Sequence, residues 1–175
     1  AFFDSWGRAE WGDRNGESGM VTSDISVAVP EGFELLPRGL GFTDFLQPIY
    51  RRLTGEGVSC GILVQQSHCN IMGMCHGGVI MTLADIAAAS GVNHACGRPA
   101  GNPTINLAVD FINAGKEGDW LQADVAHVSI KRRFGFCNGL LSGPDGVVAR
   151  FNGTFYLPDH DGIWKHAATD AVVPT

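Results

Sequence analysis

The residue with the clearest chemical potential is Asp85, a carboxylate inside the apolar segment CHGGVIMTLADIAAAS, residues 75–90. Between His76 and Arg98 the chain carries no other formal charge. Burying an ionised carboxylate without a partner is costly, so Asp85 either pairs with an arginine or serves a function. We favour function, because isolated charges in apolar surroundings concentrate in active sites. The side chain would act as a general base or as a nucleophile, and the sequence does not separate these roles.

Two glycines, Gly77 and Gly78, precede this aspartate at the expected start of a helix. The first N–H groups of a helix have no partner inside it, and the helix dipole adds positive potential there. An N–H of Gly77 or Gly78 could therefore stabilise an oxyanion, although both glycines could also serve only a tight turn. His76, just before them, is expected to cap the helix rather than to react.

The spacing of Gly77 and Asp85 predicts an assembly. Eight residues span about 12 Å along a helix axis, so one carbonyl group cannot reach both residues of the same helix. Two helices packed antiparallel about a two-fold axis would bring each helix start to the middle of the other. The sequence therefore predicts a homodimer with two composite sites.

The remaining sequence predicts the elements that hold this helix. A short helix over FTDFL and a strand over IYRRL precede the turn TGEG, and VSCGILVQQ reads as a strand. Residues 79–95 are apolar around nearly the whole helix circumference, so other structure must wrap them. Four strand-like runs with short turns follow, beginning at TINLAVDFIN, WLQADVAHVSI, FGFCNGLLSG and GVVARFNGTFYL. This order predicts an α+β domain in which an antiparallel sheet covers one long helix.

Three regions are expected along the chain. Residues 1–40 read as an N-terminal extension, whose Phe2, Phe3, Trp6 or Trp11 could dock on a partner subunit. Residues 41–158 form the folded domain, and residues 159–175 form a C-terminal tail.

Composition narrows the function classes. The 175 residues carry a net charge of -6, which argues against nucleic-acid binding and against binding to an anionic membrane. The uncharged stretch 57–84 contains several polar residues and is not expected to span a membrane. Five cysteines without a CxxC pair favour reduced thiols in a cytoplasmic protein. His68, Cys69, Cys75 and His76 lack standard zinc spacing, so no metal is expected.

The motif around Asp85 resembles the hotdog-fold acyl-CoA thioesterases of the phenylacetic-acid-degradation (PaaI-like) type. The resemblance rests on Asn70, seven residues before Gly77, on the HGG of residues 76–78, and on Asp85 within LADIAAA. It extends over residues 41–158, because NPTINLAVDF and GVVARFNGTFYL also match the family's strands. Two pieces depart from the family pattern: Ile112 to Gly115, and the stretch KRRFGF.

This resemblance implies an activity and its site residues. A thioester would be hydrolysed to a carboxylic acid and free coenzyme A, with no cofactor besides the coenzyme A of the substrate. Asn70 would orient the thioester or the water, unless it only caps a loop, and Thr104 could hold the water beside Asp85. Lys131, Arg132 and Arg133 would contact coenzyme A phosphates, unless they are only a solvated strand end. The assembly would be a dimer or a dimer of dimers.

Two other functions are compatible with the sequence. A dehydratase acting on acyl thioesters would need a histidine and a carboxylate together, which His76 meets only weakly. A non-catalytic acyl-CoA-binding module would keep the pocket without hydrolysis, and Asp85 at the motif position argues against it.

Overall fold

A computed structural model describes residues 29–55, 57–97 and 101–159. The aromatic residues proposed for docking in the N-terminal extension, and residues 160–175 of the expected C-terminal tail, lie outside the described residues. The chain forms one long α-helix, α1 (Gly77–Cys96), and two 3₁₀ helices, η1 (Gly41–Leu46) and η2 (Gln66–His68). The strands are β1 (Glu34–Leu35), β2 (Ile49–Thr54), β3 (Gly57–Leu63), β4 (Thr104–Phe111), β5 (Trp120–Lys131), β6 (Phe134–Gly143) and β7 (Gly146–Tyr156).

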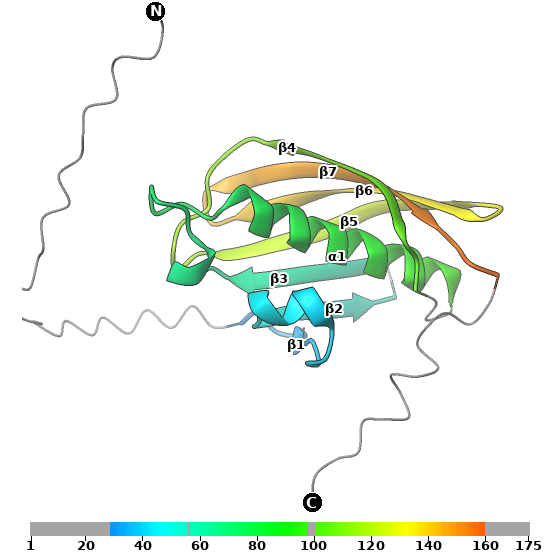
Figure 1. Cartoon of the computed structure of the whole chain (residues 1–175), viewed down its shortest axis with the longest axis horizontal. Coiled ribbons are helices and arrows are strands. Elements are labelled where there is room, and N and C mark those ends of the chain that lie inside the picture. Colours follow the sequence, from blue (N-terminus) through cyan, green and yellow to red (C-terminus); the bar gives the residue numbers. More distant parts are fainter. Residues whose placement is uncertain (1–28, 56, 98–100, 160–175) are drawn as a thin grey trace, which may run out of the picture.

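All seven strands belong to a single sheet with the order β1-β2-β3-β5-β6-β7-β4. Every neighbouring pair is antiparallel. The sheet curves around α1, which runs across its concave face (Figure 1). This arrangement confirms the predicted α+β hotdog architecture, and each strand after the helix lies where the sequence pattern placed it.

The apolar character of α1 reflects its burial against the sheet. By length and composition alone the helix could cross a membrane, but Leu83, Ala84 and Ala87 are at most 1% exposed inside the fold. Their partners on the sheet include Ile62, Leu121 and other residues of one continuous core. The sheet thus provides the cover that a helix with apolar residues around its circumference needs.

Glycine allows the helix to approach the sheet closely. A Cβ at Gly91 of α1 would lie 2.9 Å from a methyl carbon of Val125, and a Cβ at Gly135 of β6 would lie 2.5 Å from one of Val92. Both distances are shorter than carbon–carbon packing permits. Gly91, which weakens the helix by propensity, is therefore explained by the packing of α1 on β5.

Strand β1 and the buried Leu36 precede residue 41, where the domain was predicted to begin. Leu36 is buried in the core, and β1 pairs with β2 through Glu34 and Arg51. Phe33 packs edge-on against Trp120 on the sheet. The sequence pattern missed this segment because β1 has only two residues, too few to show an alternation.

Strand β4 forms one edge of the sheet and is unusually exposed. Ile105 is 59% exposed and Phe111 is 53% exposed, although the alternation in the sequence is that of a half-buried strand. A long edge strand with free backbone groups and exposed apolar side chains is a template for pairing with another chain.

Candidate active site

The centre of the site is the pair formed by Asp85 of α1 and Thr104 at the start of β4. The Thr104 hydroxyl donates a hydrogen bond of 2.9 Å to Oδ1 of Asp85. Asp85 is half-buried, and burial raises the pKa of its carboxyl group above the ordinary value, while the Thr104 hydrogen bond acts in the opposite direction. Thr104 therefore contacts Asp85 directly, which is closer than the water-holding position suggested from the sequence.

A cavity of about 660 Å³ opens beside Asp85 and runs along the second half of α1. Its helix side is formed by Asp85, Ile86, Ala89, Ser90 and Asn93. The opposite walls come from residues 36–43, from Arg51, from residues 101–103 and from Tyr156 and Pro158. The cavity has the size of a small-molecule site and mixes apolar walls with a few polar groups.

His76, Gly77 and Gly78 have different hydrogen-bonding roles at the start of α1. His76 is the N-cap, and its Nδ1 accepts a 2.9 Å hydrogen bond from the N–H of Gly78. The N–H groups of Val79 and Ile80 both donate to the carbonyl of His76. Among the residues that the structure describes, the N–H of Gly77 has no acceptor. His76 is thus the cap that the sequence predicted, and Gly77 rather than Gly78 offers the free donor.

The ring of Phe111 lies close to Gly77. A Cβ at this position would lie 3.3 Å from the ring of Phe111, at the end of β4. The Phe111 ring therefore forms an apolar wall next to the free N–H group. In such surroundings a hydrogen bond to a developing negative charge is stronger than in water.

Asn70 shapes the loop that leads into the helix. Its Oδ1 accepts hydrogen bonds from the N–H groups of Met72, at 2.9 Å, and Met74, at 3.2 Å. The loop-capping alternative considered for Asn70 is therefore realised by its oxygen. Within the described part of the chain, its side-chain NH₂ group has no acceptor and stays available to a ligand.

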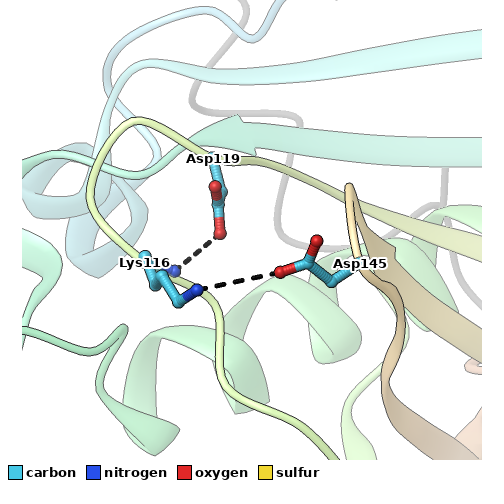
Figure 2. Close-up of polar contacts among 3 residues, drawn as sticks. All are labelled: Lys116, Asp119 and Asp145. Atoms are coloured by element: carbon cyan, nitrogen blue, oxygen red, sulfur yellow. Dashed lines mark hydrogen bonds and ion pairs between the residues drawn. The ribbon is translucent and has the colours of Figure 1, made fainter.

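A neighbouring turn holds this loop in place. Lys116 pairs with Met74 through an isolated bridge, and the N–H of Cys75 donates to the carbonyl of Gly115. Figure 2 shows how the turn is closed: Asp119 Oδ2 accepts a 2.8 Å hydrogen bond from the N–H of Lys116. The Lys116 ammonium also lies 3.8 Å from Asp145 in an exposed pair, which adds little to stability.

The basic run Lys131, Arg132 and Arg133 forms the turn between β5 and β6. Arg132 adopts a left-handed backbone conformation, with φ of 55°. Arg133 forms a 2.8 Å ion pair with Asp159 and lies over the Tyr156 ring, 5.1 Å from its centre. Because Tyr156 lines the cavity, Arg133 lies next to its rim, although none of the three basic residues lines the cavity itself. All three side chains are exposed.

The sequence interpretation missed several polar residues of the cavity. Arg51, Ser90, Asn93 and Asn102 line it together with Asp85. Asn102 donates to the carbonyl of Ala89 over 3.1 Å and so attaches the loop before β4 to the helix. One signal was visible in the sequence: Arg51 alternates with Ile49 and Leu53, so a charge stands at a strand position where the pattern expects an apolar residue.

Other possible sites hold none of the predicted residues. A second cavity, of about 630 Å³, is lined by Trp120, Gln122, Asp124 and neighbours on β5 and β6. Gln122 alternates with the fully buried Leu121 and Ala123, so this cavity opens on the sheet face away from α1.

All five cysteines are free thiols. No group of three or more metal-ligating side chains occurs in residues 29–55, 57–97 and 101–159.

A curved sheet around one central helix, with a half-buried aspartate facing a cavity from the middle of that helix, defines a protein of the hotdog-fold thioesterase class. Residues 72–156 match the Thioesterase superfamily. A Pseudomonas aeruginosa protein named as an esterase is 30% identical over 131 residues, covering 74% of this chain and 98% of the relative. The chain therefore belongs to the thioesterase superfamily and is a thioester hydrolase.

Solved structures support the same fold. PaaI of E. coli, from the phenylacetic acid degradation operon, superposes with a TM-score of 0.56 at 23% identity, over 65% of this chain and 82% of PaaI. A thioesterase protein of Streptococcus pneumoniae, solved with coenzyme A, gives a TM-score of 0.60 at 20% identity, over 66% of this chain and 90% of that protein. At these identities the likeness concerns the fold.

Proposed function

We propose that the protein hydrolyses acyl-CoA thioesters at two composite sites of a homodimer, with Asp85 from one subunit and the Gly77 N–H from the other. The observation that carries this proposal is the position of Asp85. It is half-buried, hydrogen-bonded to Thr104 and exposed to a cavity, and no described cation lies within ion-pair distance. A structural carboxylate in such surroundings would normally have a cationic partner.

Asp85 acts on the thioester in one of two ways. As a general base, it takes a proton from a water molecule that attacks the carbonyl carbon. As a nucleophile, it attacks that carbon itself and forms a mixed anhydride, which water then opens. In both cases the C–S bond breaks, the thiolate of coenzyme A takes up a proton, and the carboxylic acid is released. Thr104 holds one oxygen of Asp85 and thereby leaves the other directed to the substrate.

The Gly77 N–H stabilises the oxyanion that forms on the thioester carbonyl. Gly77 and Asp85 lie in one helix, about 12 Å apart along its axis, so the donor comes from the partner subunit. Two features support a dimer that places it there. Strand β4 is an exposed apolar edge, and the face of α1 that includes Gly78, Met81 and Asp85 is not covered by the sheet.

Coenzyme A is the proposed leaving group because the basic run 131–133 borders the cavity through Arg133 in an otherwise acidic chain. Lys131 and Arg132 form no ion pair within the described residues, whereas Arg133 is engaged by Asp159. Lys131 and Arg132 are therefore the better candidates for phosphate contacts. The Streptococcus pneumoniae structure with coenzyme A supports the same ligand.

The dehydratase alternative receives less support. That reaction needs a histidine free to exchange protons beside the carboxylate, and Nδ1 of His76 is occupied by the N–H of Gly78. Protonation of that nitrogen would cost the helix its cap.

The test is thiol release from a panel of acyl-CoAs by the parent protein and by an Asp85→Asn variant. We expect the variant to lose a factor of about 10²–10⁴ in kcat while it keeps its fold and its assembly. Asp145→Asn, which removes an exposed carboxylate from the turn between β6 and β7, is the matched control and should hydrolyse normally. Equal rates for parent and Asp85→Asn would remove Asp85 from the mechanism. Binding without hydrolysis by the parent would favour the acyl-CoA-binding module.

A further inference from the structure

Arg51 is an arginine on the helix-facing side of the sheet. In strand β2 it alternates with Ile49, which is 1% exposed, and it pairs in register with Cys60 of β3, which is fully buried. Directly opposite residues of an antiparallel pair share a face. Cys60 belongs to the same buried core as Leu83 and Ala87 of α1, so this face is the one that carries the helix.

The guanidinium of Arg51 has no partner in the part of the chain that the structure describes. No hydrogen bond or ion pair involves its side chain there, and the three ion pairs of that part join Lys116, Arg133 and Arg150 to aspartates. The neighbouring Arg52 contrasts with it on the outer face of the sheet. Arg52 lies 4.7 Å from the centre of the Phe33 ring and is 3.5 Å from the hydroxyl of Ser59. Arg52 thus has two contacts, although its buried Nε lacks a hydrogen-bond partner, whereas Arg51 has neither a hydrogen bond nor an ion pair among the described residues.

Arg51 lines the cavity that contains Asp85. These two residues are the charged groups among its described lining, and they lie too far apart to form an ion pair. A half-buried guanidinium without an acceptor is costly unless a ligand supplies one.

We propose that Arg51 is an anion-binding residue of the substrate cavity, and that it holds the paired oxygens of a carboxylate or phosphate group of the thioester. A guanidinium binds both groups through two parallel hydrogen bonds. The carboxylate and the phosphate would come from different parts of the substrate. A carboxylate would be the free end of a dicarboxylic acyl chain, whereas a phosphate would belong to coenzyme A. This proposal rests on the thioesterase function above and specifies the substrate of that site.

The experiment uses the full-length protein and an Arg51→Gln variant with two substrate series. One series contains coenzyme A thioesters, and the other contains N-acetylcysteamine thioesters, which lack all the phosphates. Each series pairs dicarboxylic monothioesters, from succinyl to suberyl, with unbranched neutral acyl groups of the same length. Arg52→Gln removes the same charge from the outer face of the same strand and is the matched control.

The two sources give different results. If Arg51 holds an acyl carboxylate, Arg51→Gln raises KM about 10- to 100-fold for the dicarboxylic substrates of both series and leaves the neutral ones unchanged. If it holds a phosphate, the same loss falls on every coenzyme A thioester and on no N-acetylcysteamine thioester. In both cases Arg52→Gln behaves like the parent protein. Effects within about twofold on all substrates, or equal effects of the two variants, would overturn the proposal.

A binding measurement separates this proposal from the proposed function. Calorimetry measures the affinity of the parent protein and of Arg51→Gln for coenzyme A. It also measures the affinity of Asp85→Asn, with and without the additional Arg51→Gln substitution, for the dicarboxylic acyl-CoAs. If Arg51→Gln lowers the affinity for these ligands but the parent protein hydrolyses no thioester, the role of Arg51 in anion binding is supported and the proposed hydrolysis is rejected. Unchanged affinity for all these ligands would reject the role of Arg51 even if hydrolysis is observed.

Discussion

The hydroxyl of Thr104 donates a 2.9 Å hydrogen bond to Oδ1 of Asp85, and this contact joins the first residue of β4 to the middle of α1. It opposes the effect of burial, which raises the pKa of the Asp85 carboxyl group. The contact therefore influences the pH range in which the carboxylate is charged and able to act.

Replacing Thr104 by valine should move the acid limb of the pH profile to higher pH. The substitution keeps the β-branched shape and removes the hydrogen bond that favours the charged carboxylate, so the pKa of Asp85 rises further. The profile of kcat/KM against pH reports this pKa in the free enzyme. Thr154→Val, on the outer face of β7, should leave the profile unchanged, and an unmoved acid limb in Thr104→Val would contradict the role of the hydrogen bond.

Replacing Asp85 by asparagine should stabilise the fold at neutral pH. The pKa of Asp85 is raised in the folded state, so its contribution to the free energy of unfolding is most favourable below the unfolded value, near 3.8, and declines as pH rises through the folded pKa. The variant avoids that loss, so its Tm at neutral pH is expected to be higher than that of the parent. Thermal unfolding followed from acid to neutral pH should show the difference vanish at low pH. A variant less stable than the parent at pH 7 would contradict the assigned environment.

Replacing Gly77 by proline should remove the oxyanion donor without breaking the helix. Proline is favoured at the first helical position, and His76 before it has φ of -64° and ψ of 136°, which a following proline accepts. We expect kcat to fall by about 10²–10³. Gly77→Ala keeps the N–H and brings its Cβ only into tight contact with Phe111, so it should retain most of the activity. Equal losses in both variants would indicate a steric effect instead.

Replacing Ile105 by lysine should weaken the dimer. Ile105 is 59% exposed on the edge strand β4, and a charged lysine there opposes edge-to-edge pairing. Sedimentation over a range of concentrations should show dissociation at higher protein concentration than for the parent. Leu53→Lys makes the same change at a 52% exposed position near the other edge of the sheet and serves as the control. An unchanged assembly in Ile105→Lys would direct the search for the interface away from β4.

The sequence was sufficient for the parts of the fold that have strong periodicity. The all-round apolar segment of α1 and the alternating runs of β4 to β7 predicted a wrapped helix and an antiparallel sheet, and the structure confirms both. The sequence pattern did not reveal that Leu36 reaches the core, because the neighbouring strand β1 has only two residues and shows no alternation.

The candidate site was predictable where its residues are close in sequence. Asp85 and Gly77 belong to one helix and His76 caps it, so their spacing already fixed their relative positions. Arg51 and Asn93 could not be placed in the same cavity from the sequence, because a strand and a helix far apart along the chain meet only through the sheet. The distinction between Gly77 and Gly78 also required coordinates, since it depends on which N–H the His76 ring accepts.

The most direct test of the composite site mixes two inactive proteins. Asp85→Asn lacks the carboxylate and Gly77→Pro lacks the donor, so each homodimer has two defective sites. A mixed dimer has one site with both groups intact, contributed by different chains, and random exchange should restore about a quarter of the parent activity. The account predicts that unfolding and refolding the two variants together yields this recovery, while each refolded alone remains inactive. A mixture no more active than its components would show that Asp85 and Gly77 do not meet across the subunit boundary.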